Sequence, residues 1–166
     1  EGMTTKYIKI DPSAKTGAGI IFIDANGQNA IGVAPGANCK LSSQDLDEAG
    51  DLFTSCRVVL MQLETPVETM KYAARKARRA EAVMILNPAP AQRLDTDVLS
   101  LIGIITPNET EAEILTGQTI NSVEDAYRAG RILLERGVKM AIITLGEKGC
   151  VYVDGAREKH YPASAV

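Results

Sequence analysis

The chain has 166 residues, of which 45% are hydrophobic and 23% charged, and its formal net charge is −3. These values are ordinary for one globular domain that buries a core. No apolar run reaches the roughly 20 residues that cross a bilayer, and no signal-peptide pattern opens the sequence, so we expect a cytoplasmic protein without a membrane partner. Four basic residues between positions 75 and 79 are interpreted as a solvated helix face, so no nucleic-acid partner is expected.

The cysteine and histidine content argues against two common kinds of site. Cys39, Cys56 and Cys150 lie far apart without a second ligand at metal-binding spacing, so we expect reduced, partly buried thiols. His160, the only histidine, lies in a polar stretch near the C-terminus. A Ser-His or Cys-His nucleophile would have this single candidate base, and we therefore set hydrolase triads aside.

The first predicted element is a β-ribbon over residues 17–35. Two alternating apolar runs, GAGIIFID and QNAIGVAP, flank the short loop Ala25–Gly27, and an Asn-Gly loop between such runs is typical of a hairpin. Both faces of the ribbon are apolar, and an isolated hairpin is only marginally stable in water. We therefore expect it to pack on a core, a ligand or a second copy of itself.

After residue 41 the pattern changes to strands that alternate with helices. Ser42 is the expected N-cap of the first helix, Pro66 the first residue of the second, and Ser122 with Asp125 a capping box. Helices are expected at 42–55, 65–82, after 108 and at 122–137, and strands at 58–63, 83–87, 102–106 and 139–146, before a hairpin over 150–163 turned at Asp154-Gly155.

Such regular alternation predicts a mostly parallel α/β sheet with helices on both faces. The apolar run over 58–63 is typical of a strand that is buried on both faces. In sheets of this kind, ligands bind at the carboxyl ends of the strands, so functional residues are expected directly after the apolar runs.

Polar residues do follow each of these runs. They are Glu64, Asn87, the stretch TPNETE at 106–111 and the stretch TLGEKG at 144–149. A purely structural explanation is available for these groups. For example, Asn108 with Glu111 is spaced as a capping box, and glycines at 146 and 149 suit a turn.

Taken together, the same groups favour a nucleotide site. Phosphoryl transfer needs amide groups or helix ends that hold phosphate oxygens, and Mg²⁺ that is held by few carboxylates. Residues 144–149 offer a hydroxyl and glycine amides, and residues 108–111 offer carboxylates. The GxxG pattern alone is weak evidence, and the chain has neither a GxxxxGK[ST] loop nor a GxGxxG motif.

Five stretches, in this order, resemble the ribokinase branch of the PfkB carbohydrate kinase family over essentially the whole chain. They are TGAGIIFIDANGQNAIGVAPGAN, MQLETP, NPAPA, ITPNETEAEILTG and ITLGEKGCVYV. The resemblance implies a Rossmann-like three-layer α/β core and a small β-lid hairpin that closes over a sugar. It also implies that residues 1–16 form a strand leading into the lid, 17–38 the lid ribbon, and 39–166 part of the nucleotide-binding core.

The resemblance assigns sugar contacts to both parts. Glu64 matches a carboxylate that hydrogen-bonds the sugar hydroxyls. Gly19, Ile21 and Val33 match lid residues that cover the sugar. In ribokinases the lid also pairs with the lid of a second subunit, so a homodimer is expected.

The resemblance also assigns the nucleotide side. Asn108 and Glu111 match the family's NxxE motif, in which Glu111 acts on Mg²⁺ through water and Asn108 lies near the triphosphate of ATP. Thr144 and Gly146 match residues that line the nucleotide phosphates, and Asn87 is placed on the same side. The neighbouring glutamates at 109 and 113 are then expected to be solvated helix surface.

Two family elements have no counterpart in these residues: the first strands with a sugar-binding Asp, and a GAGD segment with the general-base Asp. That Asp, and most ligands of the family's monovalent cation (K⁺), would lie beyond Val166. We therefore expect no catalytic residue in this chain and negligible phosphate transfer by it alone. Ribose is the expected acceptor; a fructokinase, deoxyribokinase, ketodeoxygluconate kinase or nucleoside kinase, or a non-catalytic self-associating module, remain alternatives.

Overall fold

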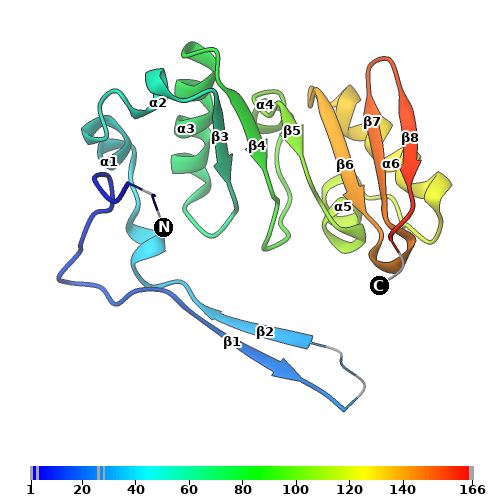
Figure 1. Ribbon diagram of the computed structural model, residues 1–166, viewed down its shortest axis with the longest axis horizontal. Helices are drawn as coiled ribbons and strands as arrows, with labels where there is room; N and C mark the ends of the chain where they lie inside the picture. Colours follow the sequence, from blue (N-terminus) through cyan, green and yellow to red (C-terminus); the bar gives the residue numbers. More distant parts are fainter. Residues whose placement is uncertain (1, 3, 26, 28, 165–166) are drawn as a thin grey trace.

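The computed structural model describes residues 2, 4–25, 27 and 29–164. It contains a six-stranded sheet in the order β3-β4-β5-β6-β7-β8 and a separate two-stranded ribbon of β1 and β2 (Figure 1). The strands are β1 (Ala18–Ile23), β2 (Asn29–Ala34), β3 (Val58–Met61), β4 (Val83–Leu86), β5 (Ile104–Ile105), β6 (Met140–Thr144), β7 (Cys150–Asp154) and β8 (Glu158–Tyr161). The helices are α1 (Ser43–Glu48), α2 (Leu52–Ser55), α3 (Val67–Arg79), α4 (Thr96–Leu99), α5 (Glu109–Thr116) and α6 (Val123–Glu135), with 3-10 turns η1 (Gly36–Lys40) and η2 (Gly146–Lys148).

The α/β class and the hairpin predicted from the sequence are confirmed. Strands β3 to β6 pair in parallel, and β7 and β8 continue the sheet in antiparallel orientation. The turn predicted at Ala25–Gly27 includes Asn26, which lies outside the described residues. Because the parallel strands run in one direction, their carboxyl ends share one edge of the sheet, and the ribbon lies below this edge in Figure 1.

The described helices pack on one face of the sheet. Cross-strand register places Met61, Leu86, Ile105, Ala141 and Val153 in one row. Leu86, Ile105 and Ala141 of this row belong to the main core, where side chains of α3, α4, α5 and α6 pack around them. In Figure 1, α4 and α6 lie behind the strands, and α3 lies beside β3. Within the described part of the chain, the helices expected on the second face are therefore not found.

This arrangement corrects the prediction for the apolar run over 58–63. Val58 and Leu60 of β3 are exposed, whereas Val59 and Met61 pack toward the helices. A continuous apolar run suits a strand that is buried on both faces. No described element covers the second face of β3, so one half of the run faces solvent.

Two predicted helix boundaries also differ. The helix expected over 42–55 is divided into α1 and α2, because Gly50 adopts a φ of +56° that a continuous helix does not allow. Pro66 is the N-cap of α3 in extended conformation, and the helix itself begins one residue later. Helix α4 was not predicted, since four residues are too few to show helical periodicity.

The strand expected within residues 1–16 is not formed in the described part of that segment. Turns take its place: the N–H of Ile8 donates to the carbonyl of Thr5 at 3.0 Å, and the Asp11 carboxylate accepts from the backbone N–H of Ser13 at 2.7 Å. A β-strand needs a neighbouring edge for its backbone groups, and none of the described strands pairs with this segment.

Surface features mostly follow the sequence. Cys56 and Cys150 are partly buried free thiols as expected, but the free thiol of Cys39 is exposed. In the basic run of α3, Lys76 pairs with Asp47 at 2.7 Å. Every helix in the described ranges is too short or too polar to cross a membrane.

Candidate functional site

The residues predicted for the site follow neighbouring strands of the sheet. Glu64 lies three positions after β3, Asn87 directly after β4 and Asn108 after β5, while Thr144 ends β6. Backbone hydrogen bonds continue past the strand ends: the N–H of Asn87 donates to the Met61 carbonyl at 3.0 Å. The carboxyl edge therefore presents these residues in the order of the strands.

Asn108 and Glu111 form a complete capping box at the start of α5. The backbone N–H of Asn108 donates to Oε2 of Glu111 at 2.9 Å, and Nδ2 of Asn108 donates to Oε1 at 3.1 Å. In return, the N–H of Glu111 donates to Oδ1 of Asn108 at 2.8 Å. Glu111 is 9% exposed, so these bonds fix its carboxylate in one orientation.

The fixed carboxylate suits Mg²⁺ held through water. A carboxylate offers about four lone-pair positions, and Asn108 occupies two of those of Glu111. Among the described residues, no group of three or more His, Cys, Asp and Glu side chains could hold a metal ion directly. Mg²⁺ usually keeps several waters and is held by one or two carboxylates together with substrate phosphates. Glu111 fits that second arrangement.

The loop that follows β6 lies beside Asn108. Asn108 and Thr144 form a parallel β-bridge, so the two residues are backbone neighbours. Gly146 has a φ of +53° and a Cβ there would meet nothing within 4 Å, so its backbone is open to a ligand. Gly149 is different, because a Cβ there would lie 2.0 Å from the carbonyl oxygen of Tyr161. Gly149 therefore has a structural role.

The structure corrects the interpretation of the neighbouring glutamates as solvated surface. Oε1 of Glu113 accepts the backbone N–H of Ile120 at 2.6 Å, and Glu113 is only partly exposed. Glu109 is also only partly exposed. The bond to Ile120 ties the loop after α5 back to the helix, and no sequence motif indicated it.

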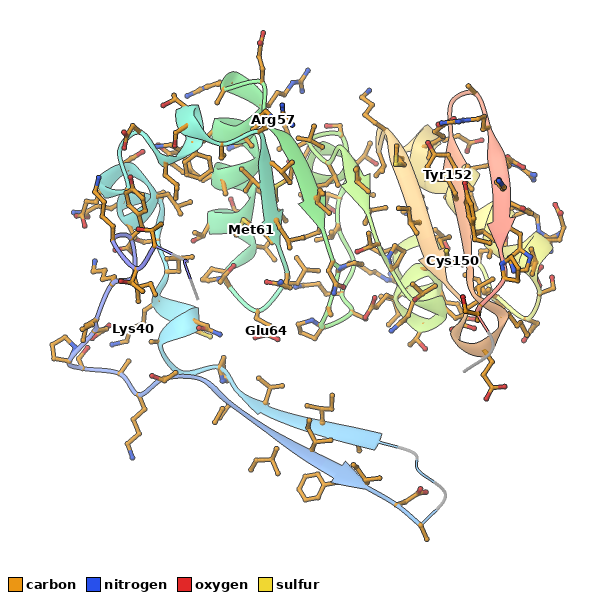
Figure 2. All side chains as sticks on the ribbon, in the orientation of Figure 1. Lys40, Arg57, Met61, Glu64, Cys150 and Tyr152 are labelled. Atoms are coloured by element: carbon orange, nitrogen blue, oxygen red, sulfur yellow. The ribbon has the colours of Figure 1, made fainter. Side chains whose placement is uncertain are left out.

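Glu64 lies apart from this cluster. Figure 2 shows Glu64 beyond the lower end of β3, on the side of the sheet that faces the ribbon. Its side chain is exposed, and no described residue hydrogen-bonds to it. In the ribbon, Gly19 pairs with Val33 and Ile21 with Ile31, so the three predicted lid contacts share one face.

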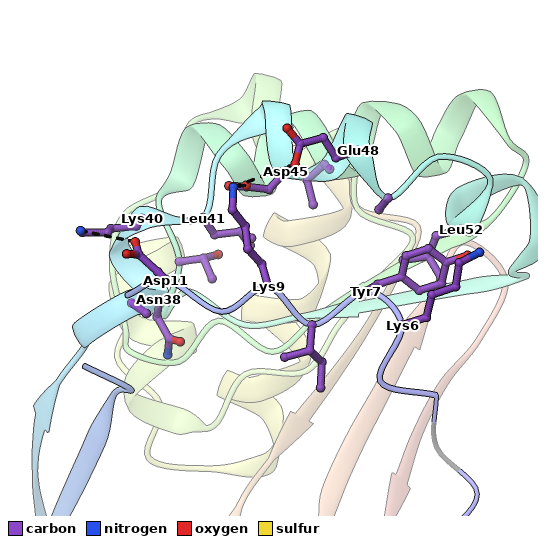
Figure 3. Close-up of a pocket in the computed structure, with 15 residues that line it drawn as sticks. Lys6, Tyr7, Lys9, Asp11, Asn38, Lys40, Leu41, Asp45, Glu48 and Leu52 are labelled. Carbon is purple, nitrogen blue, oxygen red and sulfur yellow. Dashed lines mark hydrogen bonds and ion pairs between the residues drawn. The ribbon is translucent and has the colours of Figure 1, made fainter. Parts of the chain in front are cut away.

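A hollow of about 510 Å³ lies between residues 6–11 and α1 (Figure 3). It touches Thr65, next to Glu64, but none of the residues predicted to bind nucleotide. Four of its charged side chains are already paired, since Lys9 bonds Asp45 and Lys40 lies 3.4 Å from Asp11. The hollow therefore adds no support for a nucleotide site there.

Fold and site together define an α/β protein of the kind that binds ligands at the carboxyl edge of a parallel sheet. The chain belongs to the pfkB family of carbohydrate kinases, because residues 1–166 match the family described as pfkB family carbohydrate kinase. The resemblance seen in the sequence is thereby confirmed at the level of the family.

Individual relatives carry two enzyme names. The chain is 36% identical to a deoxyribokinase of Salmonella typhi over 166 residues, which are 99% of this chain and 54% of the relative. It is 40% identical to a ribokinase of Haemophilus influenzae over 149 residues, which are 90% of this chain and 49% of the relative. The chain therefore spans about half the length of these relatives.

Solved structures agree with this fold. The crystal structure of Sa239 superposes with a TM-score of 0.91 at 37% identity, covering 98% of this chain and 54% of that one. The Arabidopsis thaliana ribokinase complexed with ribose and ATP superposes with a TM-score of 0.77 at 27% identity, covering 90% of this chain and 49% of that one.

Proposed function

We propose that this chain provides the binding groups of an ATP-dependent sugar kinase, which transfers the γ-phosphate of ATP to the primary hydroxyl of ribose. The observation that carries the proposal is the mutual fixing of Asn108 and Glu111 beside Thr144 at the carboxyl edge. Membership of a carbohydrate kinase family and likeness to a ribokinase complexed with ribose and ATP support it.

Each group at the edge then has a chemical task. In the transfer, the sugar oxygen bonds to the γ-phosphorus, the bond from that phosphorus to the β–γ bridging oxygen breaks, and the hydroxyl proton passes to a base. Mg²⁺, when bound, neutralises charge on the phosphates, and Glu111 would hold it through water. The Thr144 hydroxyl and the Gly146 amide would donate to phosphate oxygens, with Asn87 on the same side. Glu64 would accept hydrogen bonds from the sugar.

The base is not assigned to any of the described residues. The ring of His160 is engaged elsewhere, because its Nε2 donates to the carbonyl of Lys148 at 2.6 Å. Negligible turnover by the chain alone therefore stays a prediction. A K⁺ requirement and a cytoplasmic location are separate predictions, which also remain to be tested.

A second sugar is favoured by a specific observation. The deoxyribokinase relative matches 99% of the chain at 36% identity, close to the identity of the ribokinase. We therefore keep 2-deoxyribose as the alternative acceptor.

We infer that the ribbon also forms a homodimer, and its register separates two faces. One face carries Gly19, Ile21 and Val33, which would cover the sugar. The opposite face carries Ile20 and Phe22 among small residues (Ala18, Ala30, Gly32 and Ala34). Both faces are exposed in the single chain. The second face would pack on its counterpart in a second copy, because the first is committed to the sugar.

Titration of the purified chain with Mg-ATP by calorimetry tests the proposal, together with assays of ADP release in the presence of ribose, 2-deoxyribose and fructose. Saturable binding of Mg-ATP is expected even where ADP release is negligible. A chain that binds no Mg-ATP and only self-associates would contradict the kinase proposal and favour the non-catalytic module.

Two substitutions in the ribbon test which face forms the homodimer. Phe22→Lys should yield monomers, and Ile21→Lys should leave dimers; the reverse result would assign the faces the other way.

A further inference from the structure

His160 holds the loop after β6 from the neighbouring end of β8. Strand β8 lies beside β7, and the register pairs Tyr161 with Cys150 and Cys150 with Thr144. The end of β8 therefore lies at the same edge of the sheet as the end of β6, and Figure 1 shows the loop between β6 and β7 at this edge. Nε2 of His160 lies 2.6 Å from the carbonyl oxygen of Lys148. A carbonyl oxygen can only accept, so Nε2 carries the proton and donates.

This bond fixes one peptide group of the loop. The carbonyl of Lys148 and the N–H of Gly149 belong to the same planar trans peptide, so they point in opposite directions. The Lys148 carbonyl points to His160, and the N–H of Gly149 donates to the carbonyl of Gly146 at 3.0 Å. The carbonyl of Gly146 belongs in turn to the peptide that carries the N–H of Glu147, which points the opposite way, out of the loop. The bond at His160 therefore acts on the direction of this N–H through two linked peptide groups.

Two N–H groups of the loop are open to a ligand. Among the described residues, none accepts a hydrogen bond from the N–H of Gly146 or of Glu147, and both residues are exposed. The next two N–H groups are used inside the loop: that of Gly149 as described, and that of Lys148 in a bond to the Leu145 carbonyl at 3.0 Å. Successive backbone N–H groups that point out of a turn attract anions. The loop therefore offers two adjacent amide donors at the carboxyl edge.

We propose that His160 is a positioning residue, which holds the open N–H groups of Gly146 and Glu147 in the direction of the nucleotide phosphates. The inference rests on the proposed function, because it assigns these groups to the phosphates of Mg-ATP. His160 acts through the loop and does not touch the nucleotide. The side chain of Lys148 is a second anchor, since its Nζ donates to the carbonyl of Asn121 at 3.3 Å. Loss of the His160 bond should therefore loosen the loop without unfolding it.

Two substitutions separate the donor from the rest of the side chain. The amide nitrogen of glutamine can lie where Nε2 of histidine lies, so His160→Gln keeps a donor to the Lys148 carbonyl. His160→Phe keeps a flat ring and removes the donor. Because His160 is only partly buried, both variants should melt within about 4 °C of the unsubstituted chain. If His160→Phe does not fold, His160→Ala, which also lacks the donor, replaces it.

Two quantities are measured in each variant. The first is the rate at which the N–H of Gly149 exchanges with solvent, measured by NMR without any ligand. The second is the Kd for Mg-ATP, measured by calorimetry. Since one hydrogen bond is lost, His160→Phe should raise both quantities by about three- to tenfold. His160→Gln, the matched control, should change each of them by less than about twofold.

Each contrary outcome has its own meaning. Equal exchange rates in His160→Phe and the unsubstituted chain would overturn the role of His160 in fixing the loop. Faster exchange with an unchanged Kd would overturn its role in phosphate binding, and equal effects of His160→Phe and His160→Gln would overturn the role of the donated bond. An unsubstituted chain that binds no Mg-ATP would contradict the proposed function and the phosphate role together, while the exchange rates would still decide whether His160 fixes the loop.

Discussion

Asn108 and Glu111 bind each other in both directions across the first turn of α5. Oδ1 of Asn108 accepts the N–H of Glu111, and the carboxylate of Glu111 accepts from both nitrogens of Asn108. One pair therefore caps the helix and fixes a carboxylate at the edge where a nucleotide is proposed to bind. The proposed functional role would fall on the same pair as the structural one, so a test must remove one role and keep the other.

Glu111→Gln makes that separation. A glutamine at this position still accepts from the backbone N–H of Asn108 through its amide oxygen, and so preserves the backbone bond of the capping box. It loses the bond from Nδ2 of Asn108, because its NH₂ group cannot accept, and it carries no charge for Mg²⁺. We expect the melting temperature to fall by less than about 2 °C, and the Kd for Mg-ATP, measured by calorimetry, to rise at least about tenfold. Glu109→Gln is the control and should change neither quantity. Unchanged affinity in Glu111→Gln would leave Glu111 with the capping role alone.

A second prediction concerns the contact between α6 and β7. A Cβ at Gly130 would lie 2.6 Å from Cγ2 and 3.0 Å from Cβ of Val153, a stiff side chain that cannot move aside. Gly130→Ala should therefore destabilise the fold by about 1–3 kcal/mol, despite the better helix propensity of alanine. Urea unfolding measures this. Val153→Ala removes the 2.6 Å contact with Cγ2 but keeps Cβ at 3.0 Å. In that background Gly130→Ala should therefore destabilise by less than half as much; an undiminished loss would disprove the steric explanation.

The third prediction concerns the bond between Glu113 and the loop after α5. Ile120 is buried, and its N–H donates to Oε1 of Glu113. Glu113→Ala leaves this donor unsatisfied, and we expect a loss of about 1–3 kcal/mol in the free energy of unfolding. Glu113→Gln retains an acceptor and should lose less than half as much. Equal losses in both variants would show that charge, and not the hydrogen bond, is what matters.

Features that depend on nearby residues could be predicted from the sequence. Ser42, Asn108 and Ser122 cap their helices as expected, because a short polar side chain reaches the free N–H groups two or three residues ahead. The ribbon could be predicted from two alternating apolar runs on either side of a turn. The order of polar groups at the carboxyl edge followed from the alternation of strands and helices, since that alternation fixes the direction of each strand.

Features that depend on distant neighbours could not be predicted from the sequence. The run over 58–63 has the composition of a doubly buried strand, yet the exposure of Val58 and Leu60 is not encoded in that run. The bond from Ile120 to Glu113 spans seven residues through an irregular loop, and no repeat or motif marks it. The division at Gly50 required a positive φ, which a glycine permits but does not dictate.

The last prediction concerns acid stability at the start of α6. The Asp125 carboxylate accepts from the Ser122 hydroxyl at 2.7 Å, pairs with Arg128, and accepts from the backbone N–H of Asn121 at 3.1 Å. These contacts, the Ser122 hydroxyl first, lower the pKa of Asp125 from 3.8 to about 2. The expected capping box is therefore modified, because Asp125 bonds the N–H of Asn121 and not that of Ser122.

Because folding lowers this pKa, the charged form of Asp125 is favoured in the native state. Its stabilisation is complete above about pH 4 and is lost as the pH falls through about 2. Asp125→Asn should therefore lower stability near neutral pH and flatten the decline between pH 4 and 2, measured as urea midpoints across that range. Asp95→Asn is a control, because Asp95 caps α4 without a side-chain bond. If the Asp125→Asn variant lost stability with acid as steeply as the unsubstituted chain, another carboxylate would control this transition.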